Sequence, residues 1–311
     1  MKNTTLRQLR VFEAVARHLS YTRASEELFL TQPAVSMQIK QLEGSVGLPL
    51  FEQIGKRIYL TEAGGELYHY SRTIAQQLAE AETVLEELKG IKRGRINISV
   101  ASTANYFAPQ LLAIFSKRFE TVTVSLDVTN RETLVRQLAT NEKDMVIMGL
   151  PPRGTDLVAE VFMENPLVVI APPNHPLTQE SKIPLARLQQ ETFLVREQGS
   201  GTRIAMERFF TQKNIRITTG MEMNSNEAIK QAVQAGLGLG IVSIHTVALE
   251  LEVKRLTVLN VESLPIMRHW YIVHRQGKRL SPIAQAFKDF ILSEAEQLLI
   301  NKAPLLGYTP P

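Results

Sequence analysis

The chain contains 311 residues, enough for two or three compact domains at roughly 100 to 200 residues each. Hydrophobic residues make up 44% and charged residues 21%, which is ordinary globular usage and excludes a disordered or collagen-like chain. The absence of cysteine excludes disulfides, thiolate metal sites and thiol catalysis. The formal net charge is only +4, but residues 1–60 hold eight Lys or Arg against five Glu, so most of the basic excess is N-terminal.

The N-terminal segment carries no export signal that we can recognise. Residues 1–30 are studded with charges and hold no apolar run like that of a signal peptide. Nowhere do about 18 uncharged apolar residues follow one another, as a membrane-spanning helix requires. We therefore expect a soluble cytoplasmic protein, and an exported solute-binding receptor is disfavoured.

Three short amphipathic helices are predicted at the start of the chain. The first has apolar residues at three- and four-residue steps, namely Leu6, Leu9, Phe12, Val15, Ala16 and Leu19. Ser20 is suited to cap a second helix that ends near Phe29 and Leu30. Thr31 is suited to cap the third helix, which tolerates Pro33 in its first turn. Its apolar stripe consists of Val35, Ile39, Leu42 and Val46.

A hairpin and a long helix are expected next. Residues 50–53 and 58–60 have strand character and flank a turn at Gly55, so residues 1–60 predict a winged helix-turn-helix. Thr61 then caps a helix to about Gly90, which would span about 45 Å. Its heptad positions are Leu67, Ile74, Ala81 and Leu88, with Tyr70, Val84 and Ile91 between them and Gln77, Leu78 and Leu85 out of register. Residues 61–91 are therefore expected to form a dimer, and the alternative is a helix packed on its own domain.

Beyond Arg95 the pattern changes to alternating strands and helices, which predicts mostly parallel sheets covered on both faces. The first set comprises strands at 95–101, 122–128 and 145–148 with helices at 109–119 and 132–139. The second comprises strands at 167–171, 193–195, 215–221 and 239–242 with helices from 203 and at 226–235, followed by a late strand at 269–274 and a helix at 282–299. Two α/β lobes indicate a cleft between them. The predicted domains are thus 1–60, 61–91 and 92–302, with a loose tail at 303–311.

The most specific motif runs from Ser20 to Gly64 and contains TRASEEL, TQPAVSMQIKQLE and LPLFE, followed by LTEAG. This stretch resembles the N-terminal domain of LysR-type transcriptional regulators over its whole length. Within that family, Met37 and the stretch GLPLFEQIGKRIYLTEAG look most like regulators of carbon-fixation operons, for RuBisCO and inorganic-carbon uptake. The resemblance implies a homodimer or homotetramer that binds double-stranded promoter DNA, with a two-lobed, periplasmic-binding-protein-like α/β effector domain.

The third helix carries the expected base contacts. The second helix of a helix-turn-helix enters the major groove, where short hydrogen-bonding side chains read base edges and Met37 could touch a thymine methyl. Basic residues beside it and at the wing tip are expected on phosphates or in the minor groove. The predicted DNA-binding residues are Arg23, Thr31, Gln32, Pro33, Ser36, Met37, Gln38, Lys40, Lys56 and Arg57. The alternative for this polar face is an ordinary solvated surface.

Three polar clusters follow predicted strands or open predicted helices, where free backbone N–H groups and the helix dipole favour anions. The predicted effector-binding residues are Ser102, Thr103 and Asn105; Thr129, Asn130 and Arg131; and Ser200, Thr202 and Arg203. A small anionic metabolite is therefore the expected effector, and a sugar phosphate or phosphorylated acid if the carbon-fixation likeness holds. The alternative for each cluster is ordinary helix capping.

No catalytic, metal or cofactor site is expected. GLGLG at 236–240 does not complete GxGxxG, the six His show neither HExxH nor ligand spacing, and no Ser lies in GxSxG. The expected function is a ligand-responsive LysR-type regulator of carbon-fixation genes and not an enzyme. The alternatives are a LysR-type regulator of an unrelated operon and an α/β enzyme with a DNA-binding head.

Overall fold

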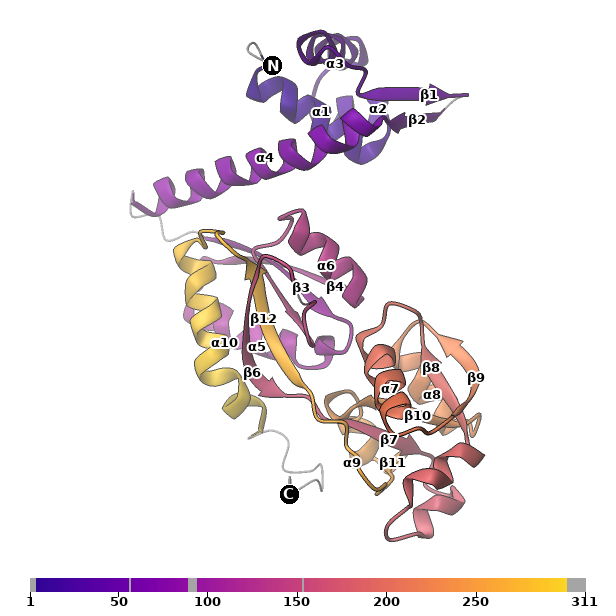
Figure 1. Cartoon of the computed structure of the whole chain (residues 1–311). Helices are drawn as coiled ribbons and strands as arrows, with labels where there is room; N and C mark the ends of the chain where they lie inside the picture. Colours follow the sequence, from indigo (N-terminus) through magenta and orange to yellow (C-terminus); the bar gives the residue numbers. More distant parts are fainter. Residues whose placement is uncertain (1–3, 56, 89–93, 153, 301–311) are drawn as a thin grey trace. The chain divides into compact units, whose positions relative to one another are not determined.

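The computed structural model describes residues 4–55, 57–88, 94–152 and 154–300 (Figure 1). The chain forms two compact units, one of Met1–Leu88 with Thr140–Glu142 and the other of Lys89–Ala139 with Lys143–Pro311. The predicted wing-tip residue Lys56, the heptad residue Ile91 and the predicted tail at 303–311 lie outside the described residues. No helix in the described part of the chain is long and apolar enough to cross a membrane.

The first unit contains the predicted winged helix-turn-helix. Its elements are α1 (Leu6–His18), α2 (Tyr21–Glu27), α3 (Gln32–Val46), β1 (Phe51–Ile54), β2 (Arg57–Leu60) and α4 (Glu62–Leu88). The side chains of Ser20 and Thr31 accept hydrogen bonds from backbone N–H groups at the starts of α2 and α3, as predicted. Gly55 adopts a φ of 63° in the hairpin turn between the antiparallel strands β1 and β2.

Short contacts hold the hairpin against the helices. Glu43, near the end of α3, accepts a hydrogen bond from the Leu50 N–H at 2.8 Å. The Thr61 hydroxyl donates to the Pro49 carbonyl at 2.7 Å and accepts from the Gly64 N–H at 3.0 Å, which caps α4. A Cβ at Gly64 would lie 2.0 Å from the Leu50 carbonyl oxygen, so only glycine fits there. The geometry of the turn into α4 thus depends on Thr61 and Gly64 of the LTEAG segment.

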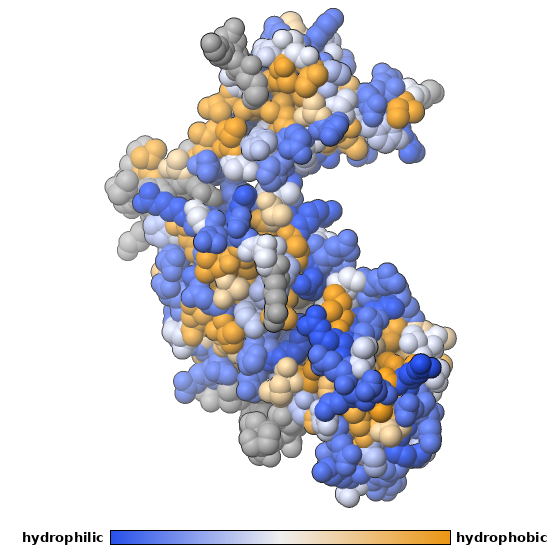
Figure 2. Space-filling view, in the orientation of Figure 1, coloured by the Kyte–Doolittle hydropathy of each residue, from blue (hydrophilic) through white to orange (hydrophobic). Residues whose placement is uncertain are grey.

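Helix α4 differs from the predicted heptad at the first heptad position, Leu67. Leu67 is 9% exposed and packs in the core of the first unit with Phe12 and Leu42, so it takes no part in an exposed stripe. Exposed apolar side chains at Tyr70, Ile74, Leu78, Ala81 and Leu85 follow one another at steps of four, four, three and four. Leu78 and Leu85, which the prediction placed out of register, therefore lie on the exposed stripe with Tyr70, Ile74 and Ala81. The side chains of the predicted heptad residues Val84 and Leu88 lie outside the described part of the chain, and the pairing of this helix stays a prediction. Figure 2 shows apolar surface on this unit over α1 and the adjoining part of α4.

The second unit contains two α/β lobes, each built on a five-stranded sheet (Figure 1). The strand order in the first lobe is β4 (Thr123–Thr129), β3 (Arg95–Ala101), β5 (Met145–Met148), β12 (His269–Arg275) and β6 (Leu157–Glu164). The strand order in the second lobe is β11 (Thr257–Val258), β7 (Leu167–Ala171), β10 (Leu239–Ser243), β8 (Thr192–Arg196) and β9 (Thr218–Met223). Helices α5 (Ala108–Arg118), α6 (Arg131–Ala139) and α10 (Pro282–Ile300) belong to the first lobe. Helices α7 (Gly201–Gln212), α8 (Asn226–Gln234) and α9 (Ala248–Glu252) belong to the second.

The sheets are mixed rather than mostly parallel. β12 runs antiparallel to both β5 and β6, and β10 runs antiparallel to β7. The chain therefore crosses between lobes twice, after β6 and before β12, because the late strand returns to the first sheet. β6 and β11 were not predicted: β6 has an irregular burial pattern, and β11 spans only two residues.

Candidate functional site: a DNA-binding face and an interlobe pocket

Helix α3 buries one face and exposes the other. Val35, Ile39 and Leu42 are at most 1% exposed. The predicted DNA-binding residues Gln32, Pro33, Ser36, Met37 and Lys40 are exposed, and Gln38 is half-buried. Met37 keeps 54% of its surface in solvent. The exposed face thus carries amides, a hydroxyl and a thioether near the start of the helix, which is the composition that base-edge recognition requires.

The residues around α3 add charge and one apolar side chain. Thr31 is exposed, and its hydroxyl accepts a hydrogen bond from the Ala34 N–H at 3.4 Å. Arg23 on α2 and Arg57 at the start of β2 are exposed, so both guanidinium groups are accessible to phosphates. Phe29, in the turn before α3, has a φ of 53° and is 95% exposed. Phe29 was not predicted as a surface residue, because large aromatic side chains are mostly buried.

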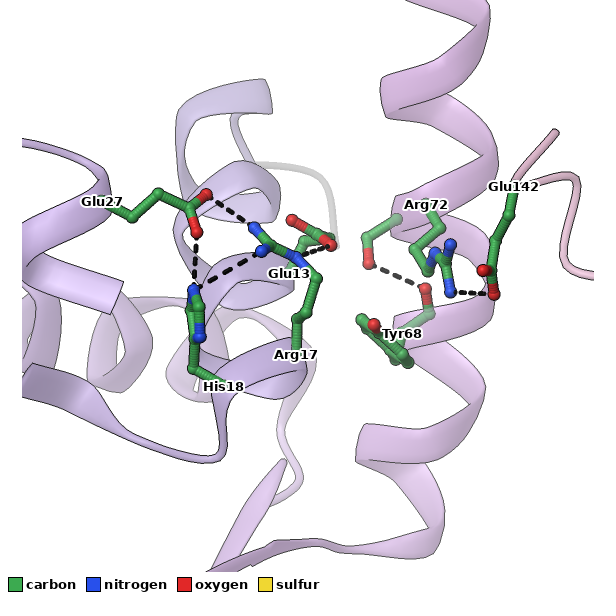
Figure 3. Close-up of polar contacts among 8 residues, drawn as sticks. Glu13, Arg17, His18, Glu27, Tyr68, Arg72 and Glu142 are labelled. Atoms are coloured by element: carbon green, nitrogen blue, oxygen red, sulfur yellow. Dashed lines mark hydrogen bonds and ion pairs between the residues drawn. The ribbon is translucent and has the colours of Figure 1, made fainter. Parts of the chain in front are cut away.

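A polar cluster joins α1 to α2 (Figure 3). Arg17 donates from Nε to Glu13 at 3.1 Å and from Nη2 to Glu27 at 2.6 Å. His18 Nε2 lies 2.6 Å from the other carboxylate oxygen of Glu27. The hydrogen bonds from Arg17, and then the contact with His18, lower the pKa of Glu27 from 4.5 to about 2. The cluster links α2 to α1, and α2 directly precedes α3.

The second unit has a pocket between its lobes, which we call the interlobe pocket. It collects residues from the ends of β3, β4, β5 and β8, the start of α7 and the two segments where the chain crosses between lobes. Its walls are Ala101, Ser102, Thr103, Thr129, Asn130, Arg131, Met148, Gly149, Asn165, Arg196, Ser200, Gly201, Thr202, Arg268 and Trp270. Seven of the nine predicted effector-binding residues are therefore brought together by the fold.

Arg196 links the two sides of this pocket. Its side chain is 3% exposed and makes two hydrogen bonds to the Glu197 carboxylate, at 2.7 and 2.9 Å. It also donates to Asn226 Oδ1 at 2.5 Å and to Ser102 Oγ, in the first lobe, at 3.3 Å. Because Glu197 neutralises its charge, Arg196 acts here mainly as a bridge between lobes.

Two buried polar atoms in the pocket walls have no hydrogen-bond partner among the described residues. These atoms are the indole Nε1 of Trp270, a residue 1% exposed, and Oδ1 of Asn165, a residue 3% exposed. An unpaired buried polar group costs about 1 to 3 kcal/mol. A ligand that hydrogen-bonds to these atoms would recover that free energy.

Arg131 and Arg268 give the pocket its charge. Burial, followed by the positive charge of Arg208, lowers the pKa of Arg131. Burial, followed by the charges of Arg131 and Arg208, lowers the pKa of Arg268. Within the described part of the chain neither guanidinium forms an ion pair, and no Asp or Glu is among the walls named above. The pocket therefore favours an anion.

Not every predicted residue has a free polar group in the pocket. Asn130 Oδ1 accepts from the Thr133 N–H at 3.0 Å, so this side chain acts as a helix cap, the alternative left open above. The Ser200 side chain makes no such cap bond and is 4% exposed. Ser102 accepts from Arg196, and Thr103 and Thr202 are almost fully buried.

Two predicted effector contacts do not line the pocket. Asn105 lies exposed in the short 3₁₀ segment after β3. Arg203 points its guanidinium to Glu207 at 2.7 Å, to the Arg196 carbonyl at 2.9 Å and to Glu222. These acceptors neutralise the Arg203 side chain, which therefore has no free charge for an anion, contrary to the prediction. Among the described residues, the pocket arginines without an ion pair are Arg131 and Arg268.

Four wall residues with polar side-chain atoms were missed from the sequence, namely Asn165, Arg196, Arg268 and Trp270. Arg196 follows three buried apolar residues in the strand TFLVR, and a charge at the end of a buried strand is a usable signal. Asn165 and Arg268 lie on segments outside strands and helices, where neither spacing nor composition marks them. No group of three or more His, Asp or Glu able to hold a metal ion occurs among the described residues.

Comparison with known proteins agrees with both halves of the structure. Residues 6–65 match the bacterial regulatory helix-turn-helix family of LysR proteins, and residues 89–296 match the LysR substrate-binding domain. A RuBisCO operon transcriptional regulator of Allochromatium vinosum is 61% identical over 95% of this chain and 98% of its own.

Solved structures show the same architecture. The Synechocystis CcmR regulatory domain, solved in complex with 2-PG, is 40% identical with a TM-score of 0.64, and covers 66% of this chain and 99% of its own. Full-length CbnR, solved with its target DNA, has a TM-score of 0.68 at 21% identity, over 93% of this chain and 99% of its own, and this likeness concerns the fold. The chain belongs to the LysR family of ligand-responsive, DNA-binding transcriptional regulators.

Proposed function

We propose that this chain regulates transcription of a carbon-fixation operon, and that its effector is a small phosphorylated or carboxylated anion bound in the interlobe pocket. The 61% identity, along nearly the whole chain, to a regulator named for the RuBisCO operon carries the first half. The second half is supported by Arg131 and Arg268, which line the pocket without an ion pair, and by the complex of the related CcmR domain with 2-PG.

In this proposal residues 1–60 bind promoter DNA, residues 61–91 join two copies and residues 92–302 bind the effector. Base contacts come from Gln32, Ser36 and Met37, because these side chains stand on the exposed face of α3. Arg23, Lys40 and Arg57 contact phosphates.

The size of the interlobe pocket links effector binding to the arrangement of the lobes. The cavity is about 30 Å³, room for one or two water molecules. A metabolite enters only if the lobes or their side chains move apart. An effector that binds one arrangement of the lobes better than another shifts the population toward that arrangement. This shift would transmit effector binding to the rest of the chain.

The target operon is tested by incubating the full chain with fragments of its own genome and sequencing what it retains. Fragments upstream of carbon-fixation genes should be enriched. The Gln32→Ala variant serves as the control and should lose this enrichment. Enrichment upstream of an unrelated operon would overturn the assignment and leave the DNA-binding role intact.

The effector is tested by calorimetry on the full chain with 2-phosphoglycolate. Thr202→Val keeps the shape of a side chain in the pocket wall and removes its hydroxyl, so it should weaken binding about tenfold. Thr211→Val makes the same change at an exposed position of the same helix and should leave binding unchanged. Binding of neutral metabolites but of no anion would contradict the proposal.

A further inference from the structure

A second pocket shares a wall with the interlobe pocket. Both are lined by Arg131, Gly201 and Arg268, so these three residues separate the two hollows. The second, which we call the outer arginine pocket, is about 240 Å³ and is thus several times roomier. Its remaining walls are Leu150, Ile204, Ala205, Arg208, Phe209, Gln212, Ile266 and Met267.

Three guanidinium groups gather at this pocket from three parts of the fold. Arg131 opens α6 in the first lobe, Arg208 stands on α7 in the second, and Arg268 lies on the segment that crosses back to the first lobe. None of the three forms an ion pair within the described part of the chain, and no acidic residue is among the walls. Two other buried or half-buried arginines of this unit have carboxylate partners, since Arg196 pairs with Glu197 and Arg203 pairs with Glu207.

Gathering like charges without an acid opposes folding, and burial increases that cost. The pKa values show this cost. Burial and then the charge of Arg208 lower the pKa of Arg131, and burial and then the charges of Arg131 and Arg208 lower the pKa of Arg268. An anion among the three groups would remove the repulsion. Groups whose pKa is perturbed by burial and by neighbouring charges cluster at functional sites.

Two of the three groups are held in place. Arg131 Nε donates to the Leu150 carbonyl at 3.4 Å, and Arg268 Nη1 donates to the Gly201 carbonyl at 2.8 Å. A Cβ at Gly149 would lie 2.7 Å from Nη2 of Arg268, so the glycine leaves room for this guanidinium. Arg208 is exposed and makes no hydrogen bond among the described residues, which leaves it able to close over a ligand.

We propose that the outer arginine pocket is a second anion-binding site, distinct from the interlobe pocket, for a small oxyanion with two or more negative charges, such as a phosphate or diphosphate group. Its volume is below that of pockets for drug-sized ligands and suits a small group. Planar guanidinium groups match the oxygens of phosphate through paired, charge-assisted hydrogen bonds.

The two sites would be coupled, because Arg131 and Arg268 face both. An anion in the outer pocket would neutralise part of the charge of these two groups and so lower the charge available to the interlobe effector. By linkage, each ligand then alters the affinity for the other by the same factor. This proposal goes beyond the carbon-fixation assignment and holds whichever metabolite occupies the interlobe pocket.

The test uses the full chain and calorimetric titration with pyrophosphate at about 150 mM salt, where distant charges are screened. Arg208→Gln removes a group that lines only the outer pocket and should weaken binding at least about tenfold. Arg216→Gln removes an equal charge at an exposed position of the same lobe that lines neither pocket, and binding should change less than about twofold. Thr202→Val, which alters only the interlobe pocket, should also leave it unchanged.

Other outcomes would overturn the proposal. Equal losses in Arg208→Gln and Arg216→Gln would indicate attraction to overall charge alone. Loss in Thr202→Val with retention in Arg208→Gln would place the ion in the interlobe pocket. Absence of pyrophosphate and phosphate binding to the unmodified chain would exclude the second site. Failure of 2-phosphoglycolate to bind would bear on the proposed effector and leave the outer-pocket result intact.

Discussion

The carboxylate of Glu27 is one residue whose protonation state bears on the stability of the DNA-binding unit. Its two oxygens lie 2.6 Å from Arg17 Nη2 and 2.6 Å from His18 Nε2, and these contacts lower its pKa to about 2. A carboxyl group whose pKa is lower in the folded chain stabilises the fold above the unfolded pKa of 4.5, and this contribution is lost as the pH falls through about 2. Because the side chain is 40% exposed, solvent screening limits the effect to on the order of 1 kcal/mol.

Glu27→Gln should lower the free energy of unfolding of the first unit by about 1 kcal/mol at pH 7. The difference from the unmodified chain should shrink as the pH falls below 4.5 and vanish near 2, because Glu27 itself is then protonated. Denaturant unfolding at a series of pH values measures it. Glu26→Gln, an exposed neighbour on the same helix, is the control and should cost little at any pH. A Glu27→Gln deficit independent of pH would contradict the assignment.

At the scale of the element, α3 and the wing should contribute differently to DNA binding. Gln32→Ala should weaken binding to the cognate operator by about 1 to 3 kcal/mol and leave nonspecific binding almost unchanged, because the amide reads a base edge. Arg57→Ala should weaken all sequences alike and reduce the slope of affinity against salt by about one. Fluorescence anisotropy with cognate and scrambled duplexes, at several salt concentrations, separates the two. Equal losses on both duplexes for Gln32→Ala would show that α3 is not the reading helix.

Helix α4 is expected to pair with α4 of a second copy. The exposed stripe of Tyr70, Ile74, Leu78, Ala81 and Leu85 follows the three- and four-residue steps of a helix–helix seam. Ile74→Asp should dissociate the dimer at micromolar concentration and weaken binding to an operator with two half-sites, because a carboxylate would be buried in the seam. Light scattering measures the mass. Gln77→Asp, exposed between the stripe positions, is the matched control, and a dimeric Ile74→Asp protein would contradict the pairing.

At the scale of the whole effector unit, several contacts join the two lobes. The crossing segments hydrogen-bond to each other through Asn165 N–H to the Arg268 carbonyl at 2.7 Å and Leu167 N–H to the Ile266 carbonyl at 3.0 Å. Arg196 reaches Ser102 across the pocket. On a third side, Lys230 lies 4.8 Å from the ring centre of Tyr106 in the other lobe. These contacts fix the spacing of the two lobes around the interlobe pocket, so a ligand that moves the lobes apart would have to break some of them.

Of these residues, we expect Lys230 to contribute most to the stability of the fold. It is 3% exposed, and its Nζ lies 2.7 Å from Glu250 and 2.8 Å from Glu227. Lys230→Met should lower the free energy of unfolding by about 3 to 5 kcal/mol, because it leaves the half-buried Glu250 carboxylate unpaired. Glu227→Gln, at a side chain 55% exposed, should cost under about 1 kcal/mol. Differential scanning calorimetry measures the stability of both variants. A smaller loss of stability for Lys230→Met than for Glu227→Gln would contradict this prediction.

Much of the DNA-binding unit is determined by local sequence. Ser20 and Thr31 cap their helices as predicted, and the stripe from Val35 to Leu42 faces inward, because helix periodicity and capping depend on neighbours within a few residues. The same local rules located most strands of the effector unit. They misplaced Leu67, whose burial depends on α1 and α3 packing across the start of α4.

The effector site was determined only in part by the sequence. The clusters after β3 and β4 and at the start of α7 were visible because the ends of strands in α/β folds collect binding residues. Arg131 was predicted on those grounds, but Arg268 was not, since it lies on a crossing segment whose position depends on β12 pairing with β5 and β6, more than a hundred residues earlier. Arg203 was assigned to the site although Glu207 and Glu222 occupy it. Which arginine keeps a free charge is decided by the acids that tertiary packing places beside it, and only the folded chain specifies that.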